Sequence, residues 1–438
     1  MEERQPDPFH YRWPRLLMVG GVVLLLGLGI ALLSSPVPWG AAPAPPDEAP
    51  EATATPRYIV VAWNDLGMHC YNRDFQWLAL LPPANTLVAQ VIEVGNPPQI
   101  ITTGITVTYF FTDNTYSVLP KSNFWLYADE IFSLTEPLTP NIGLTGRGLA
   151  GTMDVRPDHF IAEWIPLTEF RDSAPTTPYP YQLATIVIQD QVSGAELARQ
   201  IVVAPVSTEM HCDNCHADGG VGGISTGIVE RNILRLHDRE EGTHLEAEAL
   251  AGTPALCARC HASNALGMPG QPGIPNLSRA MHKKHQGKVP DTQAGCYNCH
   301  PGPVTQCQRD VMLVNYNLTC PDCHGRMADV ANSNRQPWLT EPRCDTCHTG
   351  NYQQNDPLYR LSTGHGGIYC EACHDSTHAI APSREPNDAL KFIALQGYAG
   401  SLRECNVCHT SAELGPGPHG LLPSPRNRIY LPLVARQF

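Results

Sequence analysis

Seven copies of the pentapeptide Cys-x-x-Cys-His lie between residues 212 and 409 of this 438-residue chain. Two thiols at this spacing can each form a thioether to one vinyl edge of a porphyrin, and the histidine that follows is then placed beneath the iron as its proximal ligand. The spacing therefore predicts seven covalently attached haems c. The cysteines that would hold them are Cys212, Cys215, Cys257, Cys260, Cys296, Cys299, Cys320, Cys323, Cys344, Cys347, Cys370, Cys373, Cys405 and Cys408. The proximal ligands would be His216, His261, His300, His324, His348, His374 and His409.

Paired cysteines also build zinc sites and thiol redox centres. A zinc ribbon uses two Cys-x-x-Cys knuckles for each metal ion, so seven knuckles fit it poorly. A thioredoxin-like centre has one Cys-x-x-Cys beside a βαβ pattern, and no such pattern surrounds these copies. Histidine makes up 18 of the 438 residues, so its presence after every knuckle favours haem attachment over both alternatives.

Each haem iron has a sixth position, and the sequence offers a nearly matched supply of further histidines. Two histidines on one iron make it low-spin and closed to substrate, which suits electron transfer rather than bond making. The distal candidates are His237, His244, His282, His285, His365, His378 and His419. The alternates are His211, which directly precedes a haem cysteine, and His69, which would have to reach across from the preceding segment.

The first 56 residues carry a membrane-targeting pattern. Three arginines lie in residues 1–15, and residues 16–34 include an uncharged apolar run from Leu16 to Leu33. As a helix this run would be about 27 Å long, near the lower limit for a bilayer core. The positive-inside rule predicts a cytoplasmic tail over 1–15 and a body outside the cytoplasm, at the periplasmic or cell-surface side of the membrane. Residues 16–34 are either a signal anchor or a cleaved signal peptide, and residues 35–56 are a Pro/Ala-rich linker.

Residues 57–207 carry strand signals. Short β-branched or aromatic runs alternate there with turn residues, as is typical of strands. The runs are 58–63, 87–92, 105–111, 184–188 and 201–203. They predict an all-β sandwich, similar to immunoglobulin-like accessory domains. Its role stays open between docking, spacing and covering a haem edge.

Residues 208–420 provide roughly thirty residues for each haem, which is too little chain for a conventional core. We expect a loop-rich domain of short helices, in which the porphyrins supply the missing apolar bulk. The best helical candidates are 229–251 and 277–286, and residues 421–438 form a C-terminal tail. The two remaining cysteines, Cys70 and Cys307, are either a disulfide or two free thiols.

The formal net charge is −13 before any cofactor is counted. An acidic chain argues against nucleic acid and anionic lipid as partners. A basic redox partner would be attracted to it, although an acidic balance is also an ordinary means of staying soluble.

Three passages resemble the multihaem c-type cytochromes. They are 295–302 around the third motif, 369–379 around the sixth, and Leu395-Gln396-Gly397 followed by the last motif and Gly417-Pro418-His419-Gly420. The resemblance covers 208–420. It implies closely spaced haems along which electrons hop between a quinol-linked donor and an acceptor in the periplasm or outside the cell, with His378 and His419 as distal ligands. Related nitrite reductases commonly carry Cys-x-x-Cys-Lys at the reactive haem, and this sequence has no such copy.

The sequence therefore predicts an exported heptahaem electron carrier, tethered to the membrane through its N-terminal anchor, that exchanges electrons with donor and acceptor proteins. One alternative is a reductase or oxidase of a small nitrogen or sulfur compound at one five-coordinate haem. Another is a structural role as a homo-oligomer or the subunit of a cytochrome filament.

Overall fold

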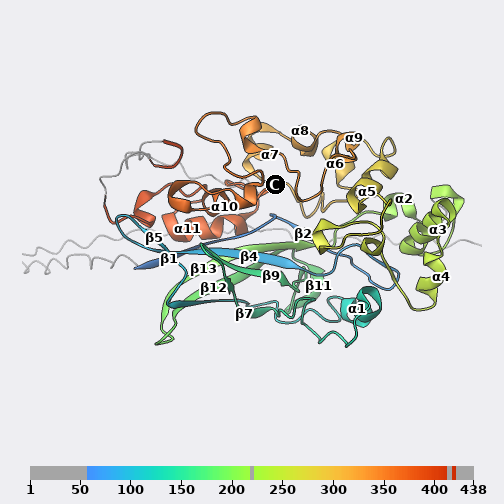
Figure 1. Ribbon diagram of the computed structural model, residues 1–438, viewed down its shortest axis with the longest axis horizontal. Coiled ribbons are helices and arrows are strands. Elements are labelled where there is room, and N and C mark those ends of the chain that lie inside the picture. Colours follow the sequence, from blue (N-terminus) through green and yellow to red (C-terminus); the bar gives the residue numbers. More distant parts are fainter. Residues whose placement is uncertain (1–56, 218–220, 412–416, 421–438) are drawn as a thin grey trace, which may run out of the picture. The chain divides into compact units, whose positions relative to one another are not determined.

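The computed structural model describes residues 57–217, 221–411 and 417–420 (Figure 1). These residues belong to one compact unit that spans Thr55–Phe438. The predicted N-terminal tail, apolar segment and linker and the C-terminal tail lie outside the described residues. Within the described ranges, no helix has the length and apolar character needed to cross a bilayer.

The N-terminal part of this unit is built from two five-stranded sheets. The first has the order β1 (Tyr58–Asn64), β4 (Asn85–Glu93), β9 (Phe160–Ile165), β8 (Asp154–Val155), with β5 (Gln99–Ile101) paired to β4. The second has the order β2 (His69–Cys70), β13 (Glu196–Ser207), β12 (Tyr181–Asp190), β6 (Ile105–Phe111), β7 (Ala150–Thr152). All pairs in both sheets are antiparallel except β2 with β13. The β-rich, antiparallel character predicted for 57–207 is confirmed.

The remaining elements of this part are short. A hairpin of β10 (Phe170–Arg171) and β11 (Ala174–Pro178) and one helix, α1 (Phe124–Phe132), complete it. The two-residue strand β3 (Leu78–Ala79) pairs in parallel with β14 (Ala255–Leu256). Strand β14 belongs to residues 208–420, which contain the seven predicted haem motifs and form the haem segment.

The side chains of strand β1 alternate between two hydrophobic clusters, one on each face of the strand. Val60 and Ala62 point into the main core, together with side chains of β4, β6, β9, β12 and β13. Ile59, Val61 and Trp63 point the other way, into a second cluster that contains Ala372 of the haem segment. Because successive side chains of a strand face opposite sides, β1 is buried on both faces. The strand thus lies between the sheet core and the haem segment.

The haem segment consists of short helices joined by long connections, as predicted. Two of these helices, α10 and α11, contact the strands β1 and β13 respectively (Figure 1). The α-helices are α2 (Asp213–His216), α3 (Val229–Glu241), α4 (Leu245–Leu250), α5 (Leu277–His285), α6 (Gln293–Cys296), α7 (Val311–Tyr316), α8 (Cys320–His324), α9 (Met327–Val330), α10 (Cys370–His374) and α11 (Leu390–Gln396).

The helix predicted over 229–251 is two helices, and the prediction of one continuous element is wrong. Gly242 ends α3 in the left-handed conformation, with φ of 69°. A residue in this conformation cannot continue a right-handed helix, and glycine adopts it without steric cost. The helix predicted over 277–286 is confirmed as α5, and Gln286 is its C-cap.

Candidate haem-binding site

Each Cys-x-x-Cys-His motif folds into a tight helical turn. The histidine N–H donates to the carbonyl of the first cysteine in several copies, at 2.8 Å for His216 and Cys212 and at 2.9 Å for His409 and Cys405. Residues three or four apart in such a turn lie on one side of it. The turn therefore presents both thiols and the imidazole together, as attachment of one porphyrin requires.

Six of the seven motif histidines face a histidine from outside the motifs. The ring centroids of these pairs are 5.8 to 6.3 Å apart, whereas the angles between the ring planes range from 22° to 89°. The shared feature is the distance rather than any stacking angle. The pairs are His216 with His285, His261 with His237, His300 with His282, His324 with His378, His374 with His419 and His409 with His365.

This distance is the one that a shared metal between two imidazoles requires. An imidazole nitrogen binds a metal at about 2 Å and the ring centre lies about 1 Å further away, so two rings on opposite sides of one metal have centres roughly 6 Å apart. Rotation about the nitrogen–metal axis leaves the angle between the rings free. The histidine pairs thus fit a haem iron with two axial imidazoles.

The hydrogen bonds of the paired histidines leave the ring nitrogen Nε2 available. His282 donates from Nδ1 to the carbonyl of Ser278 at 2.7 Å, and His285 does the same to Met281 at 2.7 Å. A carbonyl oxygen can only accept, so the proton is fixed on Nδ1. Such an outer contact orients a ligating imidazole and sets its tautomer. In four further paired histidines, Nδ1 also lies within hydrogen-bond distance of an oxygen atom. The pairs of atoms are His216 Nδ1 and Asn232 Oδ1, His237 Nδ1 and Thr243 Oγ1, His261 Nδ1 and the Pro275 carbonyl, and His419 Nδ1 and the Asn351 carbonyl.

Burial keeps some of these imidazoles neutral. It lowers the pKa of His374 to about 4 and that of His378 to about 3, and nearby positive charges act in the same direction. At neutral pH both rings are therefore uncharged. Neutral imidazole is the form that ligates a metal.

The remaining predicted ligands are placed differently. His69 has Nε2 at 2.8 Å from Asp65 Oδ1, and His211 has Nε2 at 3.0 Å from the Gly302 carbonyl. His244 is the N-cap of α4. The ring neighbour of the proximal candidate His348 is Tyr352, at 6.4 Å. The structure thus brings six of the seven distal candidates to a motif histidine.

The pairs follow one another in a row, which begins with the second motif. Helix α3 carries His237, which faces the second motif, and Asn232, which holds His216 of the first. The first and third motifs are joined by a hydrogen bond of 2.8 Å from Asn214 to Asn298. The first two steps of the row are therefore second to first and first to third.

The row continues through the later motifs in chain order. Helices α6 and α8, which carry Cys296 of the third motif and Cys320 of the fourth, contact each other. The side chains of Gln293 and Cys320 both donate to Gln308 Oε1, which joins the third motif to the fourth. Burial raises the pKa of Cys323 in the fourth motif. Asp310 and Cys347 lie close enough that their negative charges, when ionised, raise this pKa further. Because Cys347 belongs to the fifth motif, the fourth motif lies beside the fifth. The order of these motifs in space was not predictable from the sequence.

The last two steps are made by backbone contacts. Asn351, which follows the fifth motif, donates from its side chain to the carbonyl of His419, the partner of the sixth motif, at 3.2 Å. Leu402 N–H donates to the carbonyl of Cys373 at 2.8 Å, which ties the sixth motif to the segment before the seventh. The row therefore ends at the seventh motif.

The β-rich part contacts the row at both ends. Next to the second motif, β14 pairs with β3. At the seventh motif, Gly95 N–H donates to the carbonyl of Cys408 and Thr410 N–H donates to the carbonyl of Gly95, each at 3.1 Å. The β-rich part thus holds the first and last positions of the row.

The β-rich part also contacts the middle of the row. Arg309 donates to the carbonyl of Gly67 at 2.7 Å, and Lys391 donates to that of Ala62 at 3.0 Å. Tyr369 N–H donates to Gln90 Oε1 at 3.0 Å. These contacts make the sheets a scaffold that runs beside the row, and the sequence offered no signal for them.

Gly67 is needed at this boundary, and we expect Gly67→Ala to destabilise the protein strongly. Its φ is +71°, and a Cβ atom there would collide with the backbone carbonyl of Thr377. Gly104→Ala is the matched control, because Gly104 has φ of +73° and open space around the added atom. The control should cost about 1–2 kcal/mol from its backbone conformation alone, and Gly67→Ala clearly more. Equal losses in urea-induced unfolding would show that the close approach does not matter.

The cysteines outside the motifs are neighbours. Cys70 and Cys307, for which the sequence left a disulfide or two free thiols open, are free thiols in the structure. Burial raises the pKa of Cys70 to about 11 and that of Cys307 to about 12, with the charge of Cys70 among the causes at Cys307. Both thiols are therefore protonated at neutral pH.

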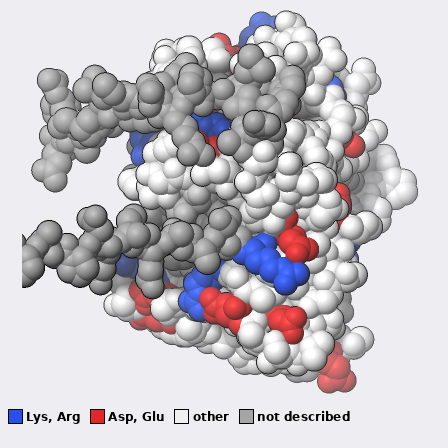
Figure 2. All heavy atoms as spheres, turned by 90° about the vertical axis from the view of Figure 1, so that its left-hand side faces the viewer, with Lys and Arg blue, Asp and Glu red and all other residues white. Residues whose placement is uncertain are grey.

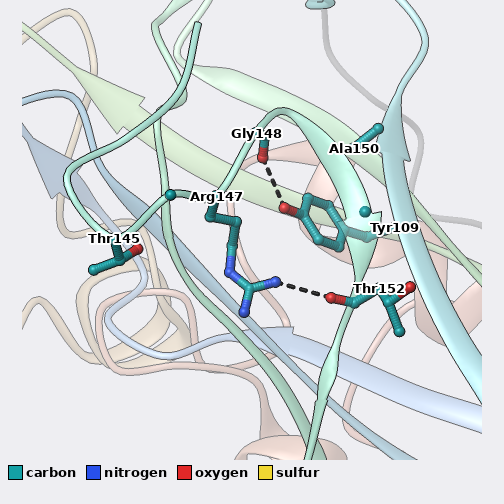
Figure 3. A pocket seen from close by; sticks show the side chains of 8 residues that line it. Tyr109, Thr145, Arg147, Gly148, Ala150 and Thr152 are labelled. Atoms are coloured by element: carbon teal, nitrogen blue, oxygen red, sulfur yellow. Dashed lines mark hydrogen bonds between the residues drawn. The ribbon is translucent and has the colours of Figure 1, made fainter. Parts of the chain in front are cut away.

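Apart from the histidine pairs, the described ranges contain a hollow but no cluster of ligands for a bare metal ion. No group of three or more His, Cys, Asp or Glu side chains in them is arranged to hold a bare metal ion. One hollow of about 290 Å³ lies in the β-rich part and is lined by Tyr109, Thr145, Arg147 and Thr152, among others (Figure 3). Tyr109 donates to the Gly148 carbonyl and Arg147 to the Thr152 carbonyl, so their polar groups are bound within the chain. This hollow contains none of the paired histidines.

Comparison of the chain with family models, with curated proteins and with solved structures gave no match.

Proposed function

We propose that this protein is a heptahaem c-type cytochrome that carries electrons along a row of haems. The observation that supports it most strongly is the set of six histidine pairs at the spacing of a shared axial metal. The haems would be held by the cysteines of each motif, and they would supply one-electron redox chemistry. The residues of this chain bind the groups, orient the imidazoles and keep them neutral.

Two axial histidines favour electron transfer over bond making. A haem iron with both axial positions filled is low-spin and has no site for a substrate. Neighbouring motifs are also linked directly: Asn214 of the first motif donates a hydrogen bond to Asn298 of the third. Short links between motifs favour transfer from one haem to the next. The donor and acceptor would be other redox proteins that reach the two ends of the row.

The proposal is tested by removing one distal histidine. In His285→Ala the first haem should lose its second imidazole, so one of seven haems should change from low-spin to high-spin in the EPR and resonance Raman spectra of the oxidised protein. Lys284→Ala is the control, because Lys284 lies on the same helix and its charge pairs with Glu240. The control should leave the spectrum unchanged. An unchanged spectrum in His285→Ala would count against axial ligation by this residue.

We further propose that the β-rich part is a sandwich of the immunoglobulin-like type. A single core between the two sheets, with alternate residues of β6 buried in it, supports a sandwich. Its proposed role is to hold the haem row in place, since its backbone contacts both ends and the middle.

We propose that the body lies outside the cytoplasm, held at the membrane by the N-terminal apolar segment. Haem attachment motifs and the apolar run from Leu16 to Leu33 support this location. On the face drawn in Figure 2, acidic and basic side chains lie beside one another in small groups. Together with the net charge of −13, this face favours a protein partner over nucleic acid.

A further inference from the structure

The fifth motif differs from the other six in its ring neighbour. The ring of His348 lies 6.4 Å from that of Tyr352, at an interplanar angle of 60°. The ring of Tyr352 also lies 4.8 Å from that of His419, which faces the sixth motif. Among the residues that the structure describes, no ring contact joins His348 to a second histidine. A tyrosine thus stands next to His348, where each of the other six motif histidines has a histidine.

The other histidines of the described ranges lie at other places in the fold. His69 and His211 have Nε2, the nitrogen needed for an axial bond, within hydrogen-bond distance of Asp65 and of the Gly302 carbonyl. His159 contacts Asp158 through Nδ1 and packs edge-on against Tyr369. His244 begins α4, which contacts α3 next to the second motif. None of these placements brings a second imidazole to His348.

The stretch of chain around His348 is exposed and carries no charged side chain. Residues 347–353 are all exposed, and Tyr352 is 43% exposed. This stretch contains no Lys, Arg, Asp or Glu. The nearby Arg343 is paired with Asp345 and also donates to the carbonyls of Gln354 and Asp356. A small uncharged molecule would therefore reach this position without a charge to attract or repel it.

We propose that the haem of the fifth motif has its sixth position open to a small uncharged ligand, of the class of the diatomic gases NO and CO. The proposal rests on the proposed function, because it concerns one of the seven haems. The fifth motif lies within the row, between the fourth and the sixth.

The test is a titration of the fully reduced heptahaem protein with CO, followed by optical spectroscopy. The expected result is one CO bound per seven haems, with a high-spin EPR signal of one haem in the oxidised protein. His365→Ala is the positive control: it opens the seventh haem, so that two CO should bind. No CO binding to the unaltered protein, with all seven haems low-spin, would overturn this proposal and leave the electron-carrier proposal intact.

Three variants test whether a side chain of this protein, and not an external ligand, occupies the sixth position of the fifth haem. Tyr352→Phe, His69→Ala and His244→Ala should each still bind one CO. If the unaltered protein binds none and one of these variants binds one, that residue is the sixth ligand and the open site is refuted. A haem content other than seven, or high-spin signals from several haems, would instead contradict the proposed function.

Discussion

Cys320→Ala/Cys323→Ala should leave a protein with six haems that no longer passes electrons from one end of the row to the other. The fourth motif contacts the third through helices α8 and α6, and it lies beside the fifth through Cys323 and Cys347. Its loss would leave a gap within the row. Mass spectrometry would count the haems, and stopped-flow spectroscopy would follow how far electrons from a reductant spread among them.

Cys257→Ala/Cys260→Ala is the matched control for this experiment. It also removes one haem of seven, but the second motif lies at an end of the row, so the other six stay connected. Transfer through the remaining six haems should then persist. If both double variants transfer electrons equally well, the haems are not arranged as a single row.

Arg309→Met should lower the free energy of unfolding by about 3–5 kcal/mol, because it leaves a buried carboxylate without its partner. Arg309 and Asp388 are 1% and 2% exposed and form two hydrogen bonds, of 2.7 and 3.0 Å. Asp388 raises the pKa of Arg309, and the guanidinium also donates to the carbonyls of Gly67 and Cys307. Urea titration followed by circular dichroism measures the loss.

Two further variants test whether the loss of stability comes from the buried carboxylate that Arg309→Met leaves unpaired. Arg309→Met/Asp388→Leu removes both charges and should recover much of the loss, since an apolar pair of similar size avoids the buried charge. Arg384→Met, at an exposed arginine nearby that donates to Gln306, should change stability little. If Arg309→Met is as mild as Arg384→Met, the buried pair does not stabilise the protein.

The strands of the β-rich part were largely predictable. The five predicted runs all lie within β1, β4, β6, β12 and β13, because apolar and β-branched residues there alternate or cluster as a half-buried or fully buried sheet requires. The two-residue strands β2, β3 and β14 were not predictable. They are too short to show a pattern, and β3 and β14 meet only because the folded chain brings Leu78 and Ala255 together.

The partners of the motif histidines could not be predicted from the sequence either. The sequence supplied the candidates, but chain order does not predict the pairs: His285 faces the first motif while His237 faces the second. The orienting groups Asn232, Thr243 and Asn351 are common polar residues with no distinguishing spacing. Their roles depend on where separate helices and turns meet.

The sequence by itself determined the seven Cys-x-x-Cys-His motifs, the surplus of histidines and the β-rich character of residues 57–207, because these depend on residue type and local spacing. Tertiary structure alone decided which histidine faces which motif, the order of the motifs in space and the neighbour of His348. These features depend on contacts between residues up to 329 positions apart, such as Ala62 and Lys391. Local patterns carry no information about such contacts, because they arise from the packing of the whole chain.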